Sequence, residues 1–387
     1  MSYFRYVSYL VLFLTLLSCS KIGTKKEYLK ISEQREEKYR KKPALRDKIG
    51  SMLMFGFHGA KSSDEGVQEI IRDIKNYKVG GVILFKYNIL SHGQLINLTD
   101  ALKQVDNKLF IAVDQEGGLV ERLNDKNGFI HTNSAKNMVA NYTPYKAYNI
   151  YYDMAKMLKT NGVNFNFAPC VDVDRIPTCS VIGKLGRSFS NDVNKVIQHS
   201  KAFVKAHKNQ HILTALKHFP GHGFAQGDTH KGVTDTTYTA NPIIELKPYQ
   251  ELLANSTYTA VMVAHVVNRN LDPEGLPATL SKPIVTGLLR EKLGFQGVVV
   301  TGVLEMGAIR NYYSLEEVVI LAINAGNDIL VFSMNSAVSA DAEQNSLWNI
   351  SPNKIIEIIE KAVLEGKISQ KRIEESYSRI TKFKKLI

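Results

Sequence analysis

The segment Leu109-Phe-Ile-Ala-Val-Asp-Gln-Glu-Gly-Gly118 shows the pattern that decides the fold of this chain. Five apolar residues come first, and acidic and amide side chains follow them at once. A short run of this kind, without polar alternation, is typical of a parallel strand that is covered on both faces. The segment therefore predicts a buried strand that ends in a polar cluster.

Seven further runs of the same kind recur along the chain, at residues 52–56, 81–85, 164–168, 213–216, 260–264, 297–301 and 328–332. Helix-length segments such as 149–161, 193–209 and 315–325 separate most of them, and residues 351–387 read as helices broken at Gly366. Eight strands alternating with helices predict an α/β fold, a TIM-type (β/α)8 barrel that forms one catalytic-type domain over residues 49–387. A doubly wound open sheet stays the alternative, because periodicity does not separate the two folds.

The composition narrows the class of protein. Hydrophobic residues at 44% and charged residues at 22% are ordinary for a globular chain, and three cysteines in 387 residues exclude a disulfide scaffold. The formal charge of +12 is concentrated, because residues 19–48 hold 11 Lys/Arg and 5 Asp/Glu, a surplus of 11 − 5 = 6. We see no basic and aromatic stripe elsewhere, so we expect no nucleic-acid partner.

The first 18 residues predict a signal peptide. The apolar run from Val7 to Leu17 has 11 residues, which is too short to span a bilayer but fits a signal-peptide core. It ends in Leu16-Leu-Ser-Cys19, which resembles a bacterial lipobox, although Leu17 is bulkier than the small residue often found there. We expect Cys19 to be lipidated and to become the mature N-terminus. An ordinary secretory signal with an incidental cysteine is the alternative.

Residues 19–48 follow as a charged tether whose Lys/Arg excess favours an anionic membrane surface, or as a solvated linker helix. We therefore expect a protein that is anchored by lipid to a bacterial membrane, on its periplasmic or extracellular face. In that compartment Cys170 and Cys179 could pair, but two thiols nine residues apart in a loop region are more often free.

Polar side chains cluster directly after the predicted strands, where barrels keep their chemistry. They are Asp114, Gln115, Glu116 and Arg122 after the third strand, Asp172, Asp174 and Arg187 after the fourth, Lys217, His218, His222, Asp228 and His230 after the fifth, and His265 after the sixth. This concentration predicts a pocket for a polar substrate. A metal site on His218 and His222 is the rival, but Pro220 prevents a regular helix between them.

At these residues the chain resembles the family 3 glycoside hydrolases, and within them the single-barrel β-N-acetylglucosaminidase branch. The resemblance runs from about residue 49 to residue 385. It is carried by Ile111-Ala-Val-Asp-Gln-Glu-Gly-Gly118 and Lys217-His-Phe-Pro-Gly-His-Gly223, and also by Pro277-Ala-Thr-Leu-Ser281 and Met306-Gly-Ala308. The family fold is a β/α barrel. Some members carry an additional sandwich domain.

The resemblance implies a role for each matching residue. Asp114 would bind hydroxyls of the sugar in the −1 subsite, and Arg122, Arg187, Lys217 and His218 would surround the same sugar. Asp228 and His230 match an Asp-x-His pair in which the histidine is the general acid and base. A carboxylate beside an imidazole favours the imidazolium form, which can protonate a leaving oxygen. Phe224 replaces a common aspartate at the start of this loop, which puts the docking of the loop in question.

The largest departure from the family is at the seventh strand. The family has a Ser/Thr-Asp pair there, and its aspartate is the nucleophile, whereas this chain has Thr301-Gly302. Glycine cannot attack an anomeric carbon, and a retaining glycosidase needs a second carboxylate about 5 Å from the acid/base group. Glu305 is near in sequence, but we expect it to point elsewhere.

We therefore expect a β-N-acetylhexosaminidase-like glycoside hydrolase that acts on GlcNAc-containing glycans such as peptidoglycan or its fragments, with its nucleophile position occupied by Gly302. A weakened or inactive sugar-binding lipoprotein on the same fold is the alternative, and a structural or adhesive scaffold is a third. The chemistry requires no cofactor and no metal. The sequence does not predict the oligomeric state.

Overall fold

The computed structural model describes residues 43–176, 181–254, 257–334, 348 and 350–387. Contacts divide the chain into residues 1–44 and a compact unit, Leu45–Ile387. The predicted signal peptide, the lipidation site Cys19 and most of the predicted tether lie outside the described residues, as does Cys179. Helix α3 (Leu45–Ser51) belongs to the compact unit, because it packs on the two C-terminal helices.

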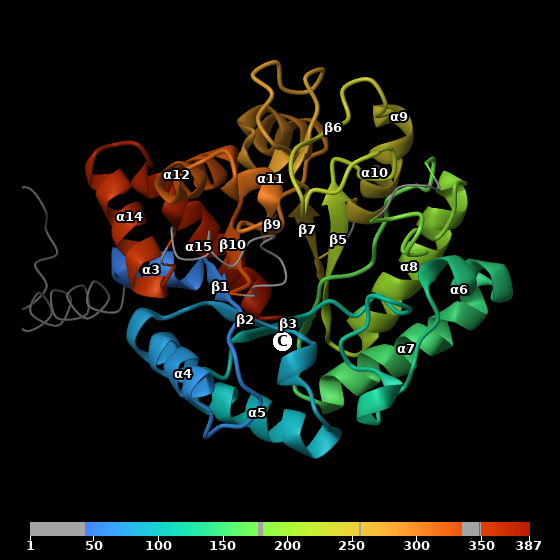
Figure 1. Ribbon diagram of the computed structural model, residues 1–387, viewed down its shortest axis with the longest axis horizontal. Coiled ribbons are helices and arrows are strands. Elements are labelled where there is room, and N and C mark those ends of the chain that lie inside the picture. The colour runs from blue at the N-terminus through green and yellow to red at the C-terminus, as the bar shows by residue number, and fades with distance from the viewer. Residues whose placement is uncertain (1–42, 177–180, 255–256, 335–347, 349) are drawn as a thin grey trace, which may run out of the picture. The chain divides into compact units, whose positions relative to one another are not determined.

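Eight parallel strands close into a barrel, in the order β1-β10-β9-β7-β5-β4-β3-β2 (Figure 1). They are β1 (Leu53–Phe55), β2 (Gly81–Leu84), β3 (Phe110–Val113), β4 (Phe165–Asn166), β5 (Leu213–Phe219), β7 (Thr259–Val263), β9 (Val299–Val303) and β10 (Ile329–Phe332). Two short strands, β6 (Thr234–Asp235) and β8 (Val266–Val267), pair with each other apart from the barrel. Each predicted strand overlaps a barrel strand, so the predicted (β/α)8 barrel is confirmed and the open sheet is excluded.

Helices surround the strands (Figure 1). Those that return the chain between strands are α4 (Glu65–Tyr77), α5 (His92–Val105), α7 (Pro144–Thr160), α8 (Val193–Asn209), α10 (Lys247–Leu253), the π-helix η5 (Pro283–Lys292) and α12 (Leu315–Ala325). Shorter helices lie in the loops, namely η2 (Lys86–Asn88), η3 (Asp125–Asn127), α6 (Ala135–Asn141), α9 (Pro242–Glu245), η4 (Ala278–Leu280) and α11 (Gly307–Arg310). The C-terminal helices are α14 (Pro352–Leu364) and α15 (Gln370–Lys384).

The helix boundaries follow from capping residues in the sequence. Ser314 caps α12 in a capping box with Glu317, which satisfies backbone donors at the helix start. Thr143 caps α7 and is followed by a proline at the first helical position. Between α14 and α15, Gly366 adopts a positive φ of 71°, which glycine adopts without the steric cost of a side chain.

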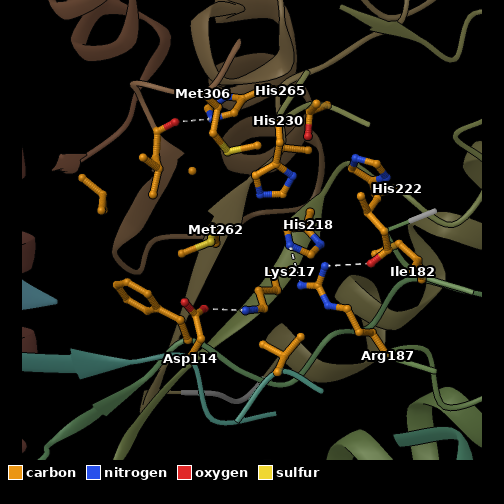
Figure 2. Close-up of a pocket in the computed structure, with 18 of the residues that line it drawn as sticks. Asp114, Ile182, Arg187, Lys217, His218, His222, His230, Met262, His265 and Met306 are labelled. Carbon is orange, nitrogen blue, oxygen red and sulfur yellow. Dashed lines mark hydrogen bonds and ion pairs between the residues drawn. The ribbon is translucent and has the colours of Figure 1, made fainter. Parts of the chain in front are cut away.

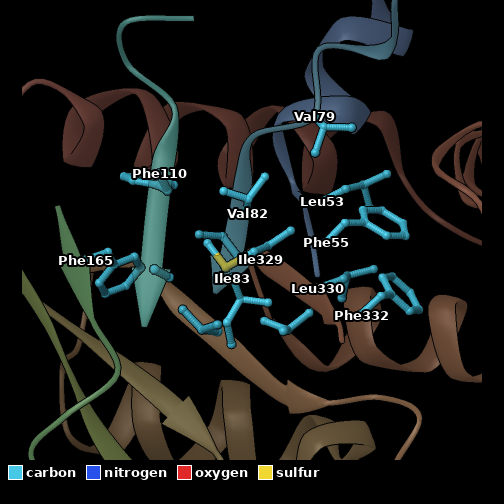
Figure 3. Packing of buried hydrophobic residues seen from close by; sticks show 14 of the residues in the cluster. Leu53, Phe55, Val79, Val82, Ile83, Phe110, Phe165, Ile329, Leu330 and Phe332 are labelled. Atoms are coloured by element: carbon cyan, nitrogen blue, oxygen red, sulfur yellow. The ribbon is translucent and has the colours of Figure 1, made fainter. Parts of the chain in front are cut away.

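The core fills the barrel and closes one of its ends. Figure 3 shows buried side chains of neighbouring strands in contact, and the rings of Phe110 and Phe165 lie 5.5 Å apart, centroid to centroid. Phe383 of α15 packs against both rings, at 6.0 and 5.6 Å, under the amino ends of β3 and β4. The amino end of the barrel is thus plugged by the C-terminal helix, which leaves the carboxyl end for a site.

A buried ionic cluster ties α15 to the barrel. Asp328, just before β10, is fully buried and accepts hydrogen bonds from Arg290 at 2.7 Å, Arg372 at 3.0 Å and Arg379 at 3.1 Å. Ser376 adds a fourth donor at 2.7 Å. Burial raises the pKa of Asp328, but the three guanidinium groups outweigh it and lower the pKa. Among the described helices we find none that is long and apolar enough for a membrane span.

Candidate active site

An ionic network joins the ends of β3 and β5 at the carboxyl end of the barrel. Lys217 of β5 is 2% exposed and donates to Asp114 at 2.8 Å, and it lies 2.6 Å from Glu116. Arg122 also donates to Asp114, at 3.1 Å. Arg187 forms a two-point contact with Glu116, at 2.9 and 2.8 Å. Two carboxylates and three cations therefore hold one another in place.

The network keeps both carboxylates ionised. Burial raises the pKa of Asp114, but Lys217 and Arg122 outweigh it and hold the pKa well below its ordinary value. For Glu116, Arg187 and Lys217 likewise outweigh burial and lower the pKa to about 2. An ionised Asp114 can accept hydrogen bonds from sugar hydroxyl groups.

The turn after β3 is held by amide side chains. Asn166 of β4 accepts from the backbone N–H of Gln115 at 3.0 Å and donates to its carbonyl at 2.9 Å. The Gln115 side chain in turn accepts from the backbone N–H groups of Arg122 and Leu123, at 2.9 and 3.0 Å. These side chains fold the loop back on itself, so that Arg122 comes to lie beside Asp114.

Asp172 fixes the orientation of His218. Its carboxylate lies 2.7 Å from Nδ1 of His218 and also accepts from the backbone N–H of His222 at 2.8 Å. Nε2 of His218 lies 3.3 Å from a guanidinium nitrogen of Arg187, which selects the tautomer with the proton on Nδ1. Burial lowers the pKa of His218, so the ring is a neutral acceptor.

Asp228 and His230 form the predicted pair. Nδ1 of His230 lies 2.8 Å from Asp228, whose carboxylate also accepts from the backbone N–H of His230 at 2.9 Å. Burial raises the pKa of Asp228, but the hydrogen bonds from His230 outweigh it and lower the pKa. Because Nδ1 is engaged, Nε2 of His230 is the nitrogen available to a ligand.

The loop that carries this pair is docked, although Phe224 stands in place of the family's aspartate. The backbone N–H groups of Gly307 and Ala308 at the start of α11 donate to the carbonyls of His230 and Thr229, at 3.3 and 3.1 Å. A Cβ at Gly307 would lie 2.7 Å from the carbonyl oxygen of His230, so the close approach depends on glycine. The loop holds its place through backbone contacts.

These groups face one cavity of about 240 Å³ (Figure 2). The lining includes the predicted residues Asp114, Arg122, Arg187, Lys217, His218, His230 and Gly302, and the further residues Ile83, Phe167, Ile182, His222, Met262, His265, Val303, Met306 and Val331. Asp228 lies behind His230, as a positioning residue does. The structure thus brings together every predicted site residue except Cys19. Within the described lining, Asp114 is the only carboxylate.

At Gly302, which the sequence predicts to occupy the family's nucleophile position, the cavity meets an imidazole. A Cβ built on Gly302 would lie 2.7 Å from Nε2 of His265 and 3.0 Å from its Cε1. His265 is 2% exposed, and its Nε2 lies 2.9 Å from the carbonyl oxygen of Val303 while its Nδ1 lies 2.9 Å from the hydroxyl of Thr279. Burial lowers the pKa of His265 to about 3, so the ring is neutral, and its Nε2 donates to the Val303 carbonyl. His265 therefore occupies space beside the position where the aspartate would stand.

Glu305 points away from the cavity, as predicted. It lies beyond the end of β9, and its carboxylate accepts from the backbone N–H groups of Ser333 and Met334, at 2.8 and 2.9 Å. Burial raises its pKa. These bonds direct the side chain toward the end of β10, and Glu305 is not among the residues that line the cavity.

Cys170, Asp172 and His218 bring potential metal ligands within 4.8 Å of one another. The Sγ of Cys170 donates to the same Asp172 oxygen that His218 contacts, at 3.2 Å, and burial raises the pKa of the thiol. The Arg187 guanidinium lies beside His218 and would repel a cation. This donor set therefore fits a hydrogen-bond network better than a metal. Cys170 is a free thiol.

Three residues of the site were named among the polar residues that follow the predicted strands, but no role was predicted for them. Glu116 holds Lys217 and Arg187, Asp172 holds His218, and His265 borders Gly302. The signal that could have found them was present, because each follows a predicted strand as the assigned residues do. Their partners are far away in sequence, so only the closed barrel shows which group each one meets.

Enzymes with this fold keep their active sites at the carboxyl ends of the strands, and this closed (β/α)8 barrel has a cavity of charged and imidazole side chains there. The fold and the cavity therefore define the class of protein as a (β/α)8-barrel enzyme. Comparisons with known proteins make the class specific. The pattern of the Glycosyl hydrolase family 3 N terminal domain matches residues 44–383. This chain belongs to glycosyl hydrolase family 3.

Named relatives agree with this assignment. The chain is 34% identical to Beta-hexosaminidase A of Pseudoalteromonas piscicida over 339 residues, which are 82% of this chain and 55% of that protein. It is 33% identical to the Beta-hexosaminidase of Xylella fastidiosa strain 9a5c, over 76% of this chain and 88% of the relative. A solved family 3 beta-N-acetylglucosaminidase from Paenibacillus sp. superposes with a TM-score of 0.79 at 32% identity, over 89% of this chain and 63% of that one. The chain thus spans less than two thirds of the first and third of these proteins.

Proposed function

We propose that this chain recognises a terminal N-acetylhexosamine of a GlcNAc-containing glycan, such as peptidoglycan or its fragments, and hydrolyses its glycosidic bond at a strongly reduced rate. The observation that carries the proposal is the single cavity that joins Asp114, Lys217, Arg187 and His218 to the Asp228–His230 pair. Charged acceptors and donors of this kind form strong hydrogen bonds with sugar hydroxyls. The names of the relatives support the class of sugar.

His230 would supply the proton for bond cleavage. In its imidazolium form Nε2 donates its proton to the glycosidic oxygen while the bond between that oxygen and the anomeric carbon breaks. Asp228 stabilises the charged ring through Nδ1. The neutral ring then accepts a proton from the water that completes hydrolysis.

With Gly302 in the nucleophile position, the acetamido oxygen of the substrate would attack the anomeric carbon. Such substrate-assisted hydrolysis is known in other glycosidase families. The new bond between that oxygen and the anomeric carbon forms as the leaving oxygen departs with the proton from His230. Since the described lining offers no carboxylate beside Gly302 to accept the amide proton, we expect turnover about 10⁴-fold below that of a complete site.

Binding without cleavage is the second candidate. The observation that favours it is the contact between His265 and the position of a Cβ on Gly302, because Nε2 of that neutral ring donates to the Val303 carbonyl and so has no lone pair to offer as a nucleophile. A pocket of this kind holds a sugar but provides no nucleophile of its own.

Turnover of an aryl N-acetylglucosaminide by wild type and His230→Ala tests the proposal. His131→Ala is the matched control, because His131 is also 50% exposed and also lies 2.8 Å from a carboxylate, yet does not line the cavity. We expect slow wild-type turnover that His230→Ala abolishes and His131→Ala preserves. Silence in all three proteins with GlcNAc binding by calorimetry supports the second candidate. Silence without binding overturns both.

We also propose that Cys19 carries a lipid that anchors the protein outside the cytoplasmic membrane of a bacterium. The apolar run at residues 7–17 and the Leu16-Leu-Ser-Cys19 segment support this proposal. Cys19→Ser should move the protein from the detergent phase to the aqueous phase in a partition experiment. Retention in the detergent phase would overturn the anchor.

A further inference from the structure

The amino end of the barrel, opposite the cavity, carries a concentration of positive charge. Eight exposed lysines lie at this end. They are found in the loops that enter β2, β3, β4, β5 and β9, in the helical turns before these loops and at the end of α15. They are Lys75, Lys78, Lys108, Lys159, Lys208, Lys292, Lys382 and Lys385. Because all eight barrel strands are parallel, these segments lie at the same end of the barrel. We call this set the basic face.

Few carboxylates offset the basic face. The same described segments contain Asp106, which pairs with Lys384 at 3.4 Å, and Glu291. The loop before β10 adds only the buried Asp328, and the turn after α14 adds Glu365, which pairs with Lys367 at 2.8 Å. The last turn of α10 before β7 adds Glu251, which pairs with Lys201 at 3.0 Å, and Lys108 donates to the carbonyl oxygen of Ile387. The basic face therefore has a large net positive charge.

Helix ends account for part of this pattern but not for all of it. A lysine in the last turn of a helix interacts favourably with the unpaired carbonyl groups there. Lys78 and Lys385 are the C-cap residues of α4 and α15, and only Lys108 lies away from a helix end. The helix dipole acts on each lysine separately, and it is the parallel barrel that brings the lysines of six segments to one surface. Such a surface suits a partner whose negative charges are spread over an area.

A groove opens on the same end of the molecule. It has a volume of about 800 Å³ and lies between the entrances of β7 and β9 and the helix α15. Leu253, Leu293, Phe295 and Leu386 form apolar walls, and Arg379 and Lys382 contribute cations. Apolar walls beside cations match a molecule with an acyl chain and an anionic head group.

We propose that the basic face is a docking surface for an anionic lipid bilayer, with the groove receiving part of one lipid. The lysines would lie over the lipid phosphates, and the cavity at the other end of the barrel would open away from the membrane toward glycan. This inference goes beyond the proposed hydrolysis and does not depend on lipidation of Cys19.

Sedimentation with vesicles tests the proposal. The chain that begins at Pro43 suits the experiment, because Leu45–Ile387 forms a compact unit with a closed barrel and because the basic tether is then absent. We expect it to bind vesicles of phosphatidylglycerol and phosphatidylcholine, with binding that weakens as salt rises, and not to bind phosphatidylcholine alone.

Two matched triple variants make the test specific. Lys159→Glu, Lys208→Glu and Lys382→Glu change the basic face, whereas Lys61→Glu, Lys86→Glu and Lys126→Glu make the same charge change in exposed loops at the opposite end. A lysine near an anionic membrane changes partitioning about fivefold, so the first triple should lose about a hundredfold or more. The second triple should keep most of its binding.

Equal loss in the two triples would overturn the proposal, because binding would then follow net charge alone. Absence of binding to anionic vesicles, or equal binding to neutral ones, would also overturn it. Both triples change exposed side chains only, but Lys159, Lys208 and Lys382 lie in the last turns of helices, where a glutamate is less favourable than a lysine. We therefore expect both triples to unfold cooperatively, the first at a somewhat lower midpoint, and this measurement excludes misfolding as a cause of lost binding.

Discussion

Restoring the carboxylate at position 302 tests how the cavity is built. In Gly302→Asp the new Cβ would meet Nε2 of His265 at 2.7 Å and the carbonyl oxygen of Val263 at 3.3 Å. The first distance is too short for a contact between a Cβ and a ring nitrogen, so the ring must move. We therefore expect the substitution alone to add little activity.

The cost of this movement follows from the contacts of the ring. His265 would lose its contacts with the Val303 carbonyl and the Thr279 hydroxyl, each worth about 1 kcal/mol. Overpacking of a buried site costs about 1–3 kcal/mol more. We expect the free energy of unfolding of Gly302→Asp to fall by about 3–5 kcal/mol.

Denaturant unfolding and turnover of an aryl N-acetylglucosaminide measure the two effects. In Gly302→Asp with His265→Ala the ring is gone, and turnover should exceed that of Gly302→Asp by about a hundredfold, since a misplacement of about 1 Å costs that much. His265→Ala alone should gain nothing. Gly93→Asp is the stability control, because a Cβ there meets no atom within 4 Å. A Gly302→Asp protein as stable as wild type and as active as the double variant would refute the steric argument.

Three further predictions concern buried carboxylates. Asp328→Asn should lower the free energy of unfolding by about 3–5 kcal/mol in a denaturant titration, because it leaves one buried and two partly buried guanidinium groups underpaired. Glu251→Gln, in an exposed ion pair, should change it by less than about 1 kcal/mol. Asp172→Asn should weaken GlcNAc binding in calorimetry because His218 loses its orienting carboxylate, and unchanged affinity would contradict that role. Burial raises the pKa of Glu245 to about 8, above its unfolded value of about 4.3, so the folded state holds the extra proton between these values and stability falls as pH rises through them. Glu245→Gln should lack this part of the decline between about pH 5 and pH 8 in thermal melts, and an identical slope would disprove it.

Most of the fold was predictable because the apolar runs are short, uninterrupted and separated by capped helices. The 315–325 segment, for example, is bounded by the capping box of Ser314 and by Gly326, and it forms a helix over the predicted residues. The sequence did not predict that β4 has only two residues. There the Asn164 side chain pairs with the backbone of β3, at Ile111 N and Leu109 O, in the place of ladder bonds. When side-chain hydrogen bonds replace backbone ones, the sequence shows no periodic pattern that could predict the replacement.

The site residues were predictable one by one, but not their partners. Asp114 and Lys217 were placed around one sugar by resemblance, and the barrel brings them to 2.8 Å across 103 residues of sequence. Lys217 is shared between Asp114 and Glu116, and His265 approaches Gly302. Both contacts depend on which side chains point inward from neighbouring strands. That geometry is set by strand register and tilt, which a single sequence does not report.

The interlocked ions at the ends of β3 and β5 bear on how a site like this one can decay during evolution. Removal of any member, such as Glu116 or Lys217, would strand an opposite charge in the interior at a cost of several kcal/mol. Selection for folding alone would therefore preserve this constellation long after catalysis had ceased. His230 is different, because it is half-exposed on a loop and the barrel does not need it. Retention of His230 next to Asp228 is therefore a better sign of continued selection for catalysis than retention of the ionic network.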